Sequence, residues 1–477
     1  MDALVIDLTH GGVKIAISLS KKNIFENIYC FDIYNTLDNI NREILEVFNI
    51  KIIDLKDLSA SKNDLIVISP VHLPLSEKEI KEKINNPAIN YQFINHHEAV
   101  AEILDNWSKR CENIPIVEIT GVKGKTSCVF MLKEILKNPL ILSSLGAILV
   151  NSEREMILKR NISITPANIK EAIDLAYKTA NPICEIAQGK IKKTDNVNYE
   201  SAIFESSLGA CGIGNVGLLT NIIEDYPIAR GNSSAAIAKK QIFKLPVAVC
   251  EKETLEKYYS DENLEKINTF SLKDKRANIY LNKLDLGLNK TNLTIEYDDL
   301  ITTESKKING SVEIETFAPY YHHVSNVLGV IGVALSLGID KETIRKGLKN
   351  YKGIPGRSSI KKIKNSIIIE EINPGINAAA IEKSIDMVRN LDNYTVIIGG
   401  DYGITCEEID EMQVAELIEN DNIEIILTEE VGLSILNKIN KKIDYFSNYE
   451  DALNSQIENN KNILLIYRSD YKKLNKR

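Results

Sequence analysis

Residues 116–127 read Ile-Val-Glu-Ile-Thr-Gly-Val-Lys-Gly-Lys-Thr-Ser, and this stretch decides the fold of the middle of the chain. Residues 116–120 have the apolar composition of a buried strand. From Cys128 to Leu136 apolar side chains recur at helical spacing, and Lys137-Asn138-Pro139 is typical of a helix end. The stretch therefore predicts a strand, a short turn and a helix. The turn lies at the helix N-terminus, where the helix dipole favours anions.

The turn itself has the residues of a phosphate-binding loop. Glycines let backbone N–H groups approach phosphate oxygens, a lysine supplies positive charge, and a threonine offers its hydroxyl to Mg²⁺. We expect the loop to bind ATP through seven residues: Gly121, Val122, Lys123, Gly124, Lys125, Thr126 and Ser127. A chance Gly-Lys turn is the alternative, which the flanking strand and helix disfavour.

Composition limits the classes of protein to consider. The net charge of −8 argues against a nucleic-acid binder and against an anionic-membrane partner. The N-terminus lacks the basic region of a signal peptide, and no apolar run reaches transmembrane length. The seven cysteines never form a C-x-x-C pair, which indicates reduced thiols without zinc or iron–sulfur sites. We therefore expect a cytoplasmic protein, while its oligomeric state is left open.

Three blocks follow one another along the 477 residues. In residues 1–111, apolar runs alternate with amphipathic stretches, which predicts a small parallel α/β sheet. Residues 112–353 contain further strands of buried type and, at 278–317, a period of two, broken at Asn309-Gly310, that predicts antiparallel hairpins. Residues 354–477 return to alternating strands and helices. In the first block, the runs with strand character are 4–8, 28–31, 50–53, 65–69 and 92–94.

Further segments place polar side chains where nucleotide sites hold them. Glu205 ends a predicted strand at 202–205, and Thr220-Asn221 end another. Lys239 lies on a predicted helix, and residues 322–326 open the helix predicted at 324–337. Taken singly, these would be a solvated strand-end glutamate, a surface lysine and a helix cap.

Taken together and in this order, the segments resemble the motifs of the Mur ligase family, ATP-dependent enzymes that join amino acids to a carboxylate through an acyl phosphate. The family motifs are T-G-x-x-G-K-[TS], E-x-S-S, T-N-x-x-x-D-H, A-K-x-x-x-[FY] and H-N-x-x-N. The matching segments of this chain are 120–126, 205–207, 220–226, 238–243 and 322–326. The resemblance implies a three-domain α/β architecture. A substrate-binding domain (1–111), a central P-loop ATP-binding domain (112–353) and a C-terminal Rossmann-like domain (354–477) would follow one another.

The same resemblance implies roles for single residues. Lys125, Glu205 and Lys239 are expected to be catalytic. Thr126, Glu205 and a carbamylated Lys239 are expected to hold Mg²⁺. The further nucleotide contacts that it implies are Asn326 for adenine, Arg357 for phosphate, and Glu370 or Glu371 for the ribose. Tyr226 replaces the usual metal-binding histidine, so one or two Mg²⁺ ions remain open.

The first block narrows the resemblance. Segments 7–12, 72–76, 96–100 and 205–209 are similar to an archaeal branch of the family that closes the last carbocyclic ring of coenzyme F(430), the nickel tetrapyrrole of methanogens. This implies activation of a propionate as an acyl phosphate, attack by a ring carbon, and release of ADP and phosphate. His10, beside a glycine turn, is expected either to bind a substrate carboxylate or to deprotonate the attacking carbon. We expect the substrate cleft to be lined by residues 9–12, His72 and His96-His97. As an alternative, His96 and His97 are structural residues that begin the helix predicted at 98–110.

Two other functions stay open. An amide-forming Mur-type ligase, acting on a cell-wall precursor or a cofactor carboxylate, would share the ATP site and differ only in the first domain. A non-catalytic nucleotide-binding regulator is disfavoured because Lys125, Thr126, Glu205 and Lys239 are all present.

Overall fold

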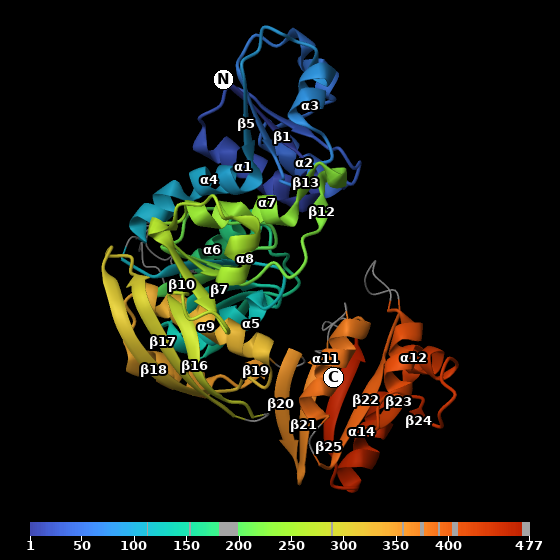
Figure 1. Cartoon of the computed structure of the whole chain (residues 1–477). Coiled ribbons are helices and arrows are strands. Elements are labelled where there is room, and N and C mark those ends of the chain that lie inside the picture. The colour runs from blue at the N-terminus through green and yellow to red at the C-terminus, as the bar shows by residue number, and fades with distance from the viewer. Residues whose placement is uncertain are drawn as a thin grey trace, which may run out of the picture. The chain divides into compact units, whose positions relative to one another are not determined.

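The structure is a computed structural model, and it describes residues 1–111, 113–151, 154–180, 199–287, 290–354, 357–372, 376–389, 392–402 and 409–469. The chain forms two compact units (Figure 1). One contains Met1–Lys283, Leu293–Glu313 and His322–Leu348, and the other contains Leu284–Asn292, Ile314–Tyr321 and Lys349–Arg477. Each unit is built on sheets with helices packed against them, which confirms the predicted α/β class.

The first sheet is small and wholly parallel, as predicted. Its described strands lie in the order β3-β2-β1-β4-β5. The strands are β1 (Asp2–Ile6), β2 (Ile28–Phe31), β3 (Lys51–Ile52), β4 (Leu65–Ser69) and β5 (Tyr91–Asn95), and the helices are α1 (Val13–Lys22), α2 (Asn39–Val47), α3 (Glu77–Ile84) and α4 (His96–Arg110). All of β1 is buried, because a central parallel strand is covered on both faces. Since β1 pairs in parallel with β4, the carboxyl ends of these two strands are neighbours.

The second sheet carries the loop predicted to bind phosphate. Its described strands lie in the order β18-β17-β16-β15-β14-β11-β6-β10-β7-β8-β9, with β6 (Ile116–Thr120) pairing in parallel with β10 (Ser201–Glu205) and β11 (Val216–Leu219). The other strands are β7 (Pro139–Ser143), β8 (Gly146–Val150), β9 (Glu155–Lys159), β14 (Val247–Glu251), β15 (Ile267–Ser271), β16 (Ile279–Asp285), β17 (Thr291–Ile301) and β18 (Lys307–Thr316). The polar ends of β6, β10 and β11 therefore lie side by side.

Helices surround this second sheet. They are α5 (Lys125–Ile135), α6 (Pro166–Ala180), α7 (Ala235–Lys239), α8 (Lys252–Tyr258), α9 (Tyr321–Ser336) and α10 (Lys341–Asn350). A separate two-stranded ribbon consists of β12 (Pro227–Ile228) and β13 (Ser233–Ser234). Helix α5 begins directly after Gly124, three residues before the predicted start, so the loop does open a helix.

One turn prediction is wrong. Asn309-Gly310 lies inside β18, and the chain turns instead at residues 302–306, where the Thr302 N–H donates to the Lys306 carbonyl. Gly310 has a different reason to be glycine. A Cβ at this position would come within 2.7 Å of the Tyr297 hydroxyl, and its φ is +155°. The glycine therefore makes room for a neighbouring ring and does not make a turn.

The second unit contains a sheet with the described order β19-β20-β21-β25-β22-β23-β24. The strands are β19 (Gly353–Ile354), β20 (Arg357–Ile363), β21 (Ser366–Ile372), β22 (Tyr394–Gly400), β23 (Glu424–Thr428), β24 (Asp444–Phe446) and β25 (Asn462–Arg468). The helices are α11 (Ala378–Val388), α12 (Glu411–Glu419), α13 (Glu429–Leu436) and α14 (Tyr449–Glu458). From β21 to β24 neighbouring strands are parallel, and β19 and β20 add an antiparallel edge.

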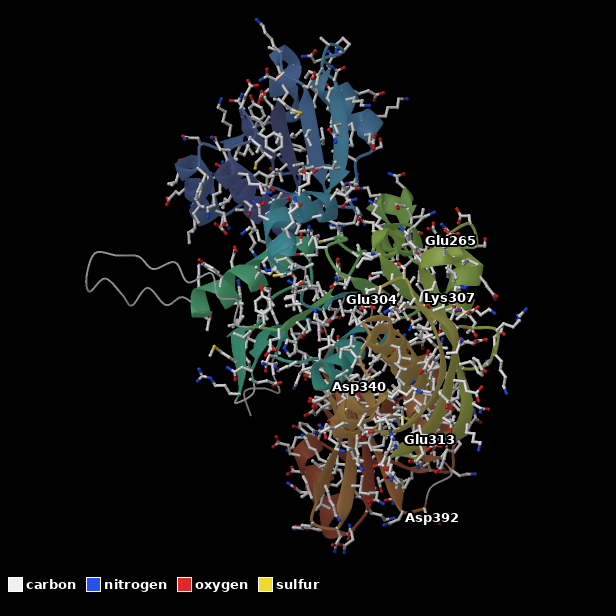
Figure 2. The ribbon with its side chains drawn as sticks, turned by 90° about the vertical axis from the view of Figure 1, so that its left-hand side faces the viewer. Glu265, Glu304, Lys307, Glu313, Asp340 and Asp392 are labelled. Atoms are coloured by element: carbon white, nitrogen blue, oxygen red, sulfur yellow. The ribbon has the colours of Figure 1, made fainter. Side chains whose placement is uncertain are left out.

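Charged residues of both signs lie on the surface of the described part of the chain. Glu304, Lys307, Glu313 and Asp340 are exposed side chains of the first unit (Figure 2). In the described residues, no helix is both long and apolar enough to span a bilayer.

Candidate active site

The loop between β6 and α5 has the backbone geometry of an anion site. Gly121 and Gly124 have φ values of +143° and +84°, which side-chain-bearing residues rarely adopt. A Cβ on Gly121 would overlap the Thr220 hydroxyl, and a Cβ on Gly124 would overlap the Asn326 amide. The loop therefore requires glycine at both positions.

The ends of the adjacent strands fix the loop. The Thr220 hydroxyl donates to the Lys123 carbonyl at 2.6 Å, and the Asn221 side-chain oxygen accepts the Lys123 N–H at 3.1 Å. The Val122 N–H donates to the Asn221 carbonyl at 2.9 Å. The Thr-Asn segment after β11 thus acts as a brace for the loop.

Thr126 and Glu205 meet as the sequence motifs require. The Thr126 hydroxyl lies 3.0 and 3.1 Å from the two carboxylate oxygens of Glu205, which is 2% exposed. Ser144 joins them, because its hydroxyl lies 3.0 Å from that of Thr126 and its N–H donates to Glu205 at 3.0 Å. Hydroxyl and carboxylate oxygens are the ligands that Mg²⁺ prefers, so this donor set fits the ion.

Ser144 is a residue that the sequence reading missed. The signal was present, since a polar Ser143-Ser144 pair directly follows the buried run of β7. Such a position at the carboxyl end of a parallel strand is where α/β sheets hold ligands. Ser127 lies half-buried in the first turn of α5.

Two lysines lie at the loop. The Lys125 ammonium donates to the Gly121 carbonyl at 3.0 Å, so it sits over the loop. Lys239 is fully buried at the end of α7, which excludes its reading as a surface lysine. Its amine donates to the Ser207 carbonyl at 2.6 Å. Burial, and then the nearby Lys125 charge, lower the pKa of Lys239 to about 7, while Asp225 opposes the shift.

Near Lys239, Tyr226 takes the place of the family's histidine. The Lys239 amine lies 5.8 Å from the centre of the Tyr226 ring. A phenol is a weaker metal ligand than an imidazole at neutral pH, and burial raises the pKa of Tyr226 further. Tyr226 therefore borders the site near Lys239 with an un-ionised ring and does not supply an ionised metal ligand.

The structure gives fewer contacts for the residues predicted to bind the adenine, the ribose and the outer phosphate of the nucleotide. Asn326 is buried on α9 and lies against Gly124, where it can shape the loop. Glu371 lies on β21 in register with Arg357, whose side chain is outside the described set. Glu370 is engaged by the Ser359 hydroxyl at 3.1 Å and the Lys361 ammonium at 2.7 Å. The nucleotide roles of Arg357 and Glu371 stay predictions.

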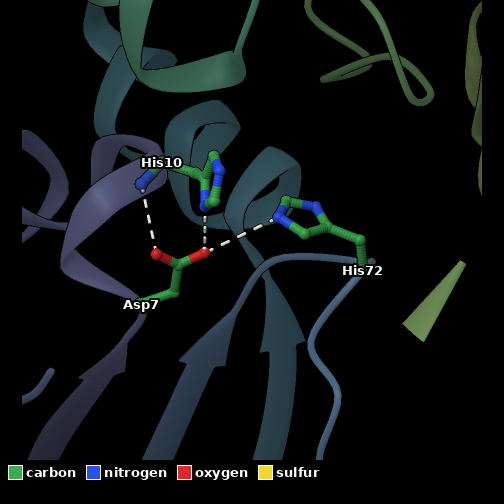
Figure 3. Close-up of side chains that lie close together, drawn as sticks. All are labelled: Asp7, His10 and His72. Atoms are coloured by element: carbon green, nitrogen blue, oxygen red, sulfur yellow. Dashed lines mark hydrogen bonds and ion pairs between the residues drawn. The ribbon is translucent and has the colours of Figure 1, made fainter. Parts of the chain in front are cut away.

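In the first domain, the structure brings together three side chains. Asp7, directly after β1, is completely buried, and its carboxylate lies 2.6 Å from His10 Nδ1 and 3.6 Å from His72 Nε2 (Figure 3). The sequence reading named His10 and His72 as cleft residues but missed Asp7 as their partner. A signal existed in the carboxylate that ends the first strand.

The pair His96-His97 does not line a cleft, contrary to expectation. His96 and His97 are 1% and 3% exposed at the start of α4. His96 Nε2 lies 3.2 Å from the Ile6 carbonyl, a structural contact, and His97 Nε2 lies 3.4 Å from the Ser206 hydroxyl. Burial is the main cause that lowers the pKa of His96 to about 4 and that of His97 to about 3, so both are neutral near pH 7.

Contacts within the first unit link the Asp7 turn to the phosphate loop. A Cβ on Gly11 would come within 2.6 Å of that of Ala167, so the turn packs closely on the start of α6. Just before that helix, the Ile164 carbonyl accepts the Ser207 N–H at 3.2 Å. Ser207 comes two residues after Glu205, and its carbonyl accepts a hydrogen bond from Lys239. The segment 205–207 therefore lies next to both the Thr126–Glu205 pair and Lys239.

Comparisons with known proteins agree with this geometry. A family model described as "Coenzyme F430 synthetase CfbE, C-terminal domain" matches residues 360–470. The chain is 29% identical over 462 residues to the coenzyme F(430) synthetase of Methanocaldococcus jannaschii, which covers 94% of this chain and 95% of that protein. It is 27% identical over 444 residues to the coenzyme F(430) synthetase of Methanosarcina acetivorans, covering 87% and 86%.

Among solved structures, the UDP-N-acetylmuramoylalanyl-D-glutamyl-2,6-diaminopimelate–D-alanyl-D-alanyl ligase of Acinetobacter baumannii aligns with a TM-score of 0.56 at 14% identity, covering 98% of this chain and 89% of that chain. At this identity the alignment establishes the fold alone. The chain is therefore similar to coenzyme F(430) synthetases along nearly its whole length, and it has the fold of a Mur ligase.

Proposed function

We infer that this chain is an ATP-dependent ligase of coenzyme F(430) biosynthesis. It activates a propionate of the nickel seco-tetrapyrrole as an acyl phosphate and closes the carbocyclic ring, releasing ADP and phosphate. The relatives named coenzyme F(430) synthetase, which match both the first and the last domain, support the substrate. An ATP-using enzyme whose described cysteines include five free, buried thiols fits the reducing cytoplasm.

One observation in the first domain favours this substrate over a uridine nucleotide. Several Mur ligases bind such a nucleotide at a glycine-rich turn, which here corresponds to residues 9–12. In this chain, however, the buried Asp7 carboxylate already accepts the Thr9 and His10 N–H groups at 3.0 and 3.2 Å. A nucleotide phosphate would need those donors and would meet a carboxylate.

The phosphate loop performs the first half-reaction by positioning. Transfer of the γ-phosphoryl group depends on alignment and charge neutralisation rather than on a protein nucleophile. The N–H groups at the start of α5 and the Lys125 ammonium would hold the phosphates, while the Val122 and Lys123 N–H groups bond Asn221 and fix the loop. Thr126 and Glu205 would hold Mg²⁺, which supplies further charge neutralisation when bound.

Lys239 is proposed as a third metal-site residue in carbamylated form. Only an unprotonated amine reacts with carbon dioxide, and a pKa of about 7 leaves much of Lys239 unprotonated at neutral pH. The carbamate would replace a cation by an oxygen ligand. Burial of the side chain would then shield the modified group from hydrolysis.

His10 is proposed as a catalytic residue on the substrate side. Its side chain is 43% exposed, so the imidazole can reach a ligand, whereas Asp7 beneath it is fully enclosed. The sequence leaves two roles open for His10, carboxylate binding and proton abstraction. The carboxylate of Asp7 behind the imidazole favours proton abstraction.

The test is a panel of acceptors read by ADP release. The protein is incubated with ATP, Mg²⁺ and either the nickel seco-tetrapyrrole or amino acids with peptide and glutamyl acceptors, while the absorption spectrum is recorded. We expect ADP release and a spectral change with the tetrapyrrole alone. ADP release only with an amino acid would replace this proposal by the amide ligase.

A further inference from the structure

Closing a carbocyclic ring requires a step that amide ligases do not have. The attacking atom is a carbon that carries a proton, and this proton must leave as the new bond forms. The groups at the phosphate loop are committed to phosphate and metal. We therefore expect the base among the side chains on the substrate side of the first unit.

The cluster of Asp7, His10 and His72 has the geometry of an oriented base. One carboxylate oxygen of Asp7 accepts the Thr9 and His10 N–H groups, and the other faces both imidazoles (Figure 3). The short contact from His10 Nδ1 to a carboxylate oxygen places the proton on Nδ1. The lone pair of His10 is then on Nε2, on the side away from Asp7.

Asp7 remains charged although it is buried. Burial alone would raise the pKa of Asp7, but hydrogen bonds from His72 and His10 outweigh it and hold the pKa below its ordinary value. A buried carboxylate behind an imidazole fixes the tautomer and stabilises the imidazolium that forms when the ring accepts a proton.

The backbone at Asp7 supports a specific role. Its φ of +72° lies in the left-handed region, which costs a non-glycine residue about 1–3 kcal/mol. Such strain persists where the surroundings over-determine the conformation. Here it aims the carboxylate back at the N–H groups of Thr9 and His10 and at the two imidazoles.

A metal site is the competing reading of the same residues. One ligand atom from each lies within 4.8 Å of the other two. However, His10 Nδ1 is only 2.6 Å from the Asp7 oxygen, and His72 Nε2 points at that same oxygen. Because the atoms face one another, they leave no common centre for an ion, and a hydrogen-bonded cluster fits the distances better.

The cluster is also close to where the activated carboxyl is expected. Residue 11 packs on the start of α6, and the carbonyl just before that helix bonds Ser207, which in turn contacts Lys239. The start of α6 and the residues just before it therefore contact both the turn that carries His10 and the segment next to Lys239.

We propose that His10 is the general base of ring closure, with Asp7 as its positioning residue and His72 as a second imidazole on the same carboxylate. This rests on the proposed function. His10 Nε2 takes the proton from the ring carbon, and the electron pair of that C–H bond attacks the acyl carbon. The bond from the acyl carbon to the phosphate oxygen breaks, and phosphate leaves with the electron pair of that bond. The products are the ring ketone, phosphate and a protonated His10, which returns its proton to solvent.

The experiment separates the two half-reactions. Acyl phosphate is trapped with hydroxylamine, and ring closure is followed by absorption. His10→Ala and His10→Gln should still give trapped hydroxamate and ADP, while ring closure falls about 10²–10⁴-fold. Added imidazole should restore part of ring closure in His10→Ala, which a purely structural role would not allow. Asp7→Asn keeps acceptors for the N–H groups and should lose ring closure in the same way.

His96→Gln is the matched control, because His96 is a buried histidine of the same domain that contacts a backbone carbonyl. This variant should lower the unfolding temperature, but the ratio of ring closure to ADP release should stay at the wild-type value. Ring closure at the wild-type rate in both His10 variants would overturn the proposal. So would a bound metal ion whose removal by chelator abolishes closure in the wild type. No ADP release from wild-type protein with the tetrapyrrole would instead refute the proposed function.

Discussion

The phosphate loop and the Asp7 turn lie in the same local arrangement of strand, turn and helix, but they differ in charge, since the phosphate loop contains lysines and the Asp7 turn contains a buried carboxylate. Each follows a buried parallel strand, leads into a helix and contains a backbone in the left-handed region. In the phosphate loop, the Val122 and Lys123 N–H groups bond Asn221, and the glycines at 121 and 124 allow the backbone to approach an outside anion at the helix start. In the Asp7 turn, the chain's own carboxylate binds those N–H groups.

The difference shows how one arrangement can serve two purposes. A turn at a helix start that holds no carboxylate of its own against its N–H groups can serve as a site for phosphate. A turn that satisfies them with a carboxylate has a fixed negative charge, and this attracts imidazoles rather than anions. We therefore expect acid–base chemistry at the Asp7 turn and nucleotide chemistry at the phosphate loop.

The largest expected effect on activity comes from replacing a glycine of each turn by alanine. Gly124→Ala combines a φ of +84° with overlap on Asn326 and should weaken ATP binding about 100-fold or more. Gly11→Ala, with a φ of +105°, should leave ATP binding intact and impair only ring closure. Titration with a fluorescent ATP analogue measures the first effect.

Gly338→Ala is the control for this pair, since it has a φ of +77° but nothing within 4 Å of the added Cβ. It should cost stability without changing ATP affinity. If Gly11→Ala weakened ATP binding as much as Gly124→Ala, the assignment of ATP binding to the phosphate loop and of ring closure to the Asp7 turn would be wrong.

Removing the loop's charge should have the next largest effect. Lys125→Ala loses a charge-assisted contact worth about 1.5–3 kcal/mol, which lowers kcat/KM roughly 10–150-fold. The nucleotide product should remain ADP, because the loop still directs attack to the γ-phosphate. Chromatography of the nucleotides checks this, with exposed Lys137→Ala, near the end of the same helix, as control. AMP as the coupled product would contradict the assignment.

The two regions also differ in how they treat a buried charge, since Asp7 stays ionised and Lys239 tends to be neutral. With a pKa of about 7 against an ordinary 10.5, folded Lys239 binds fewer protons than the unfolded chain between these values. The wild type should therefore gain stability as pH rises from 7, by up to about 1.4 kcal/mol per pH unit. Lys239→Met should lack this gain.

Urea unfolding of both proteins at pH 7, 8 and 9, in buffers freed of carbon dioxide, gives this difference. Lys240→Met is a suitable control. The Lys240 ammonium donates to Glu262, which raises the pKa of this exposed neighbour above 10.5, so Lys240 stays protonated in both the folded and the unfolded chain and should add no trend between pH 7 and 9. A stability difference between wild type and Lys239→Met that is independent of pH would show that the amine is not driven toward neutrality.

The smallest effect is expected at Ser144. Ser144→Ala removes one hydroxyl contact to Thr126 and keeps the Ser144 N–H bond to Glu205. A single hydrogen bond is worth about 0.5–1.5 kcal/mol, so ADP formation should fall about 2- to 12-fold. The ratio of ring closure to ADP release should not change. A change in that ratio would mean that Ser144 also acts on the tetrapyrrole.

Local pattern was enough to predict several elements. The strands at 28–31 and 65–69 have the predicted bounds, because each is a run of mainly apolar residues between polar segments. The turn predicted at Asn309-Gly310 failed for a tertiary reason, since Gly310 makes room for the Tyr297 ring inside a strand. Likewise, the expectation that His96 and His97 line a cleft failed for a tertiary reason, since both rings are buried against the Ile6 carbonyl and the Ser206 hydroxyl, which lie far away in the chain.

The sequence by itself determined the strand, loop and helix at 116–135, because that motif is contiguous and its glycines, lysine and threonine act within a few residues of one another. Only the tertiary structure decided that Asp7 would face His72. These residues are far apart in the chain, and they meet because β1 and β4 pair in parallel and end at the same edge of the sheet. The same holds for the burial of Lys239, whose shifted pKa comes from surroundings supplied by several elements and not from its neighbours in sequence.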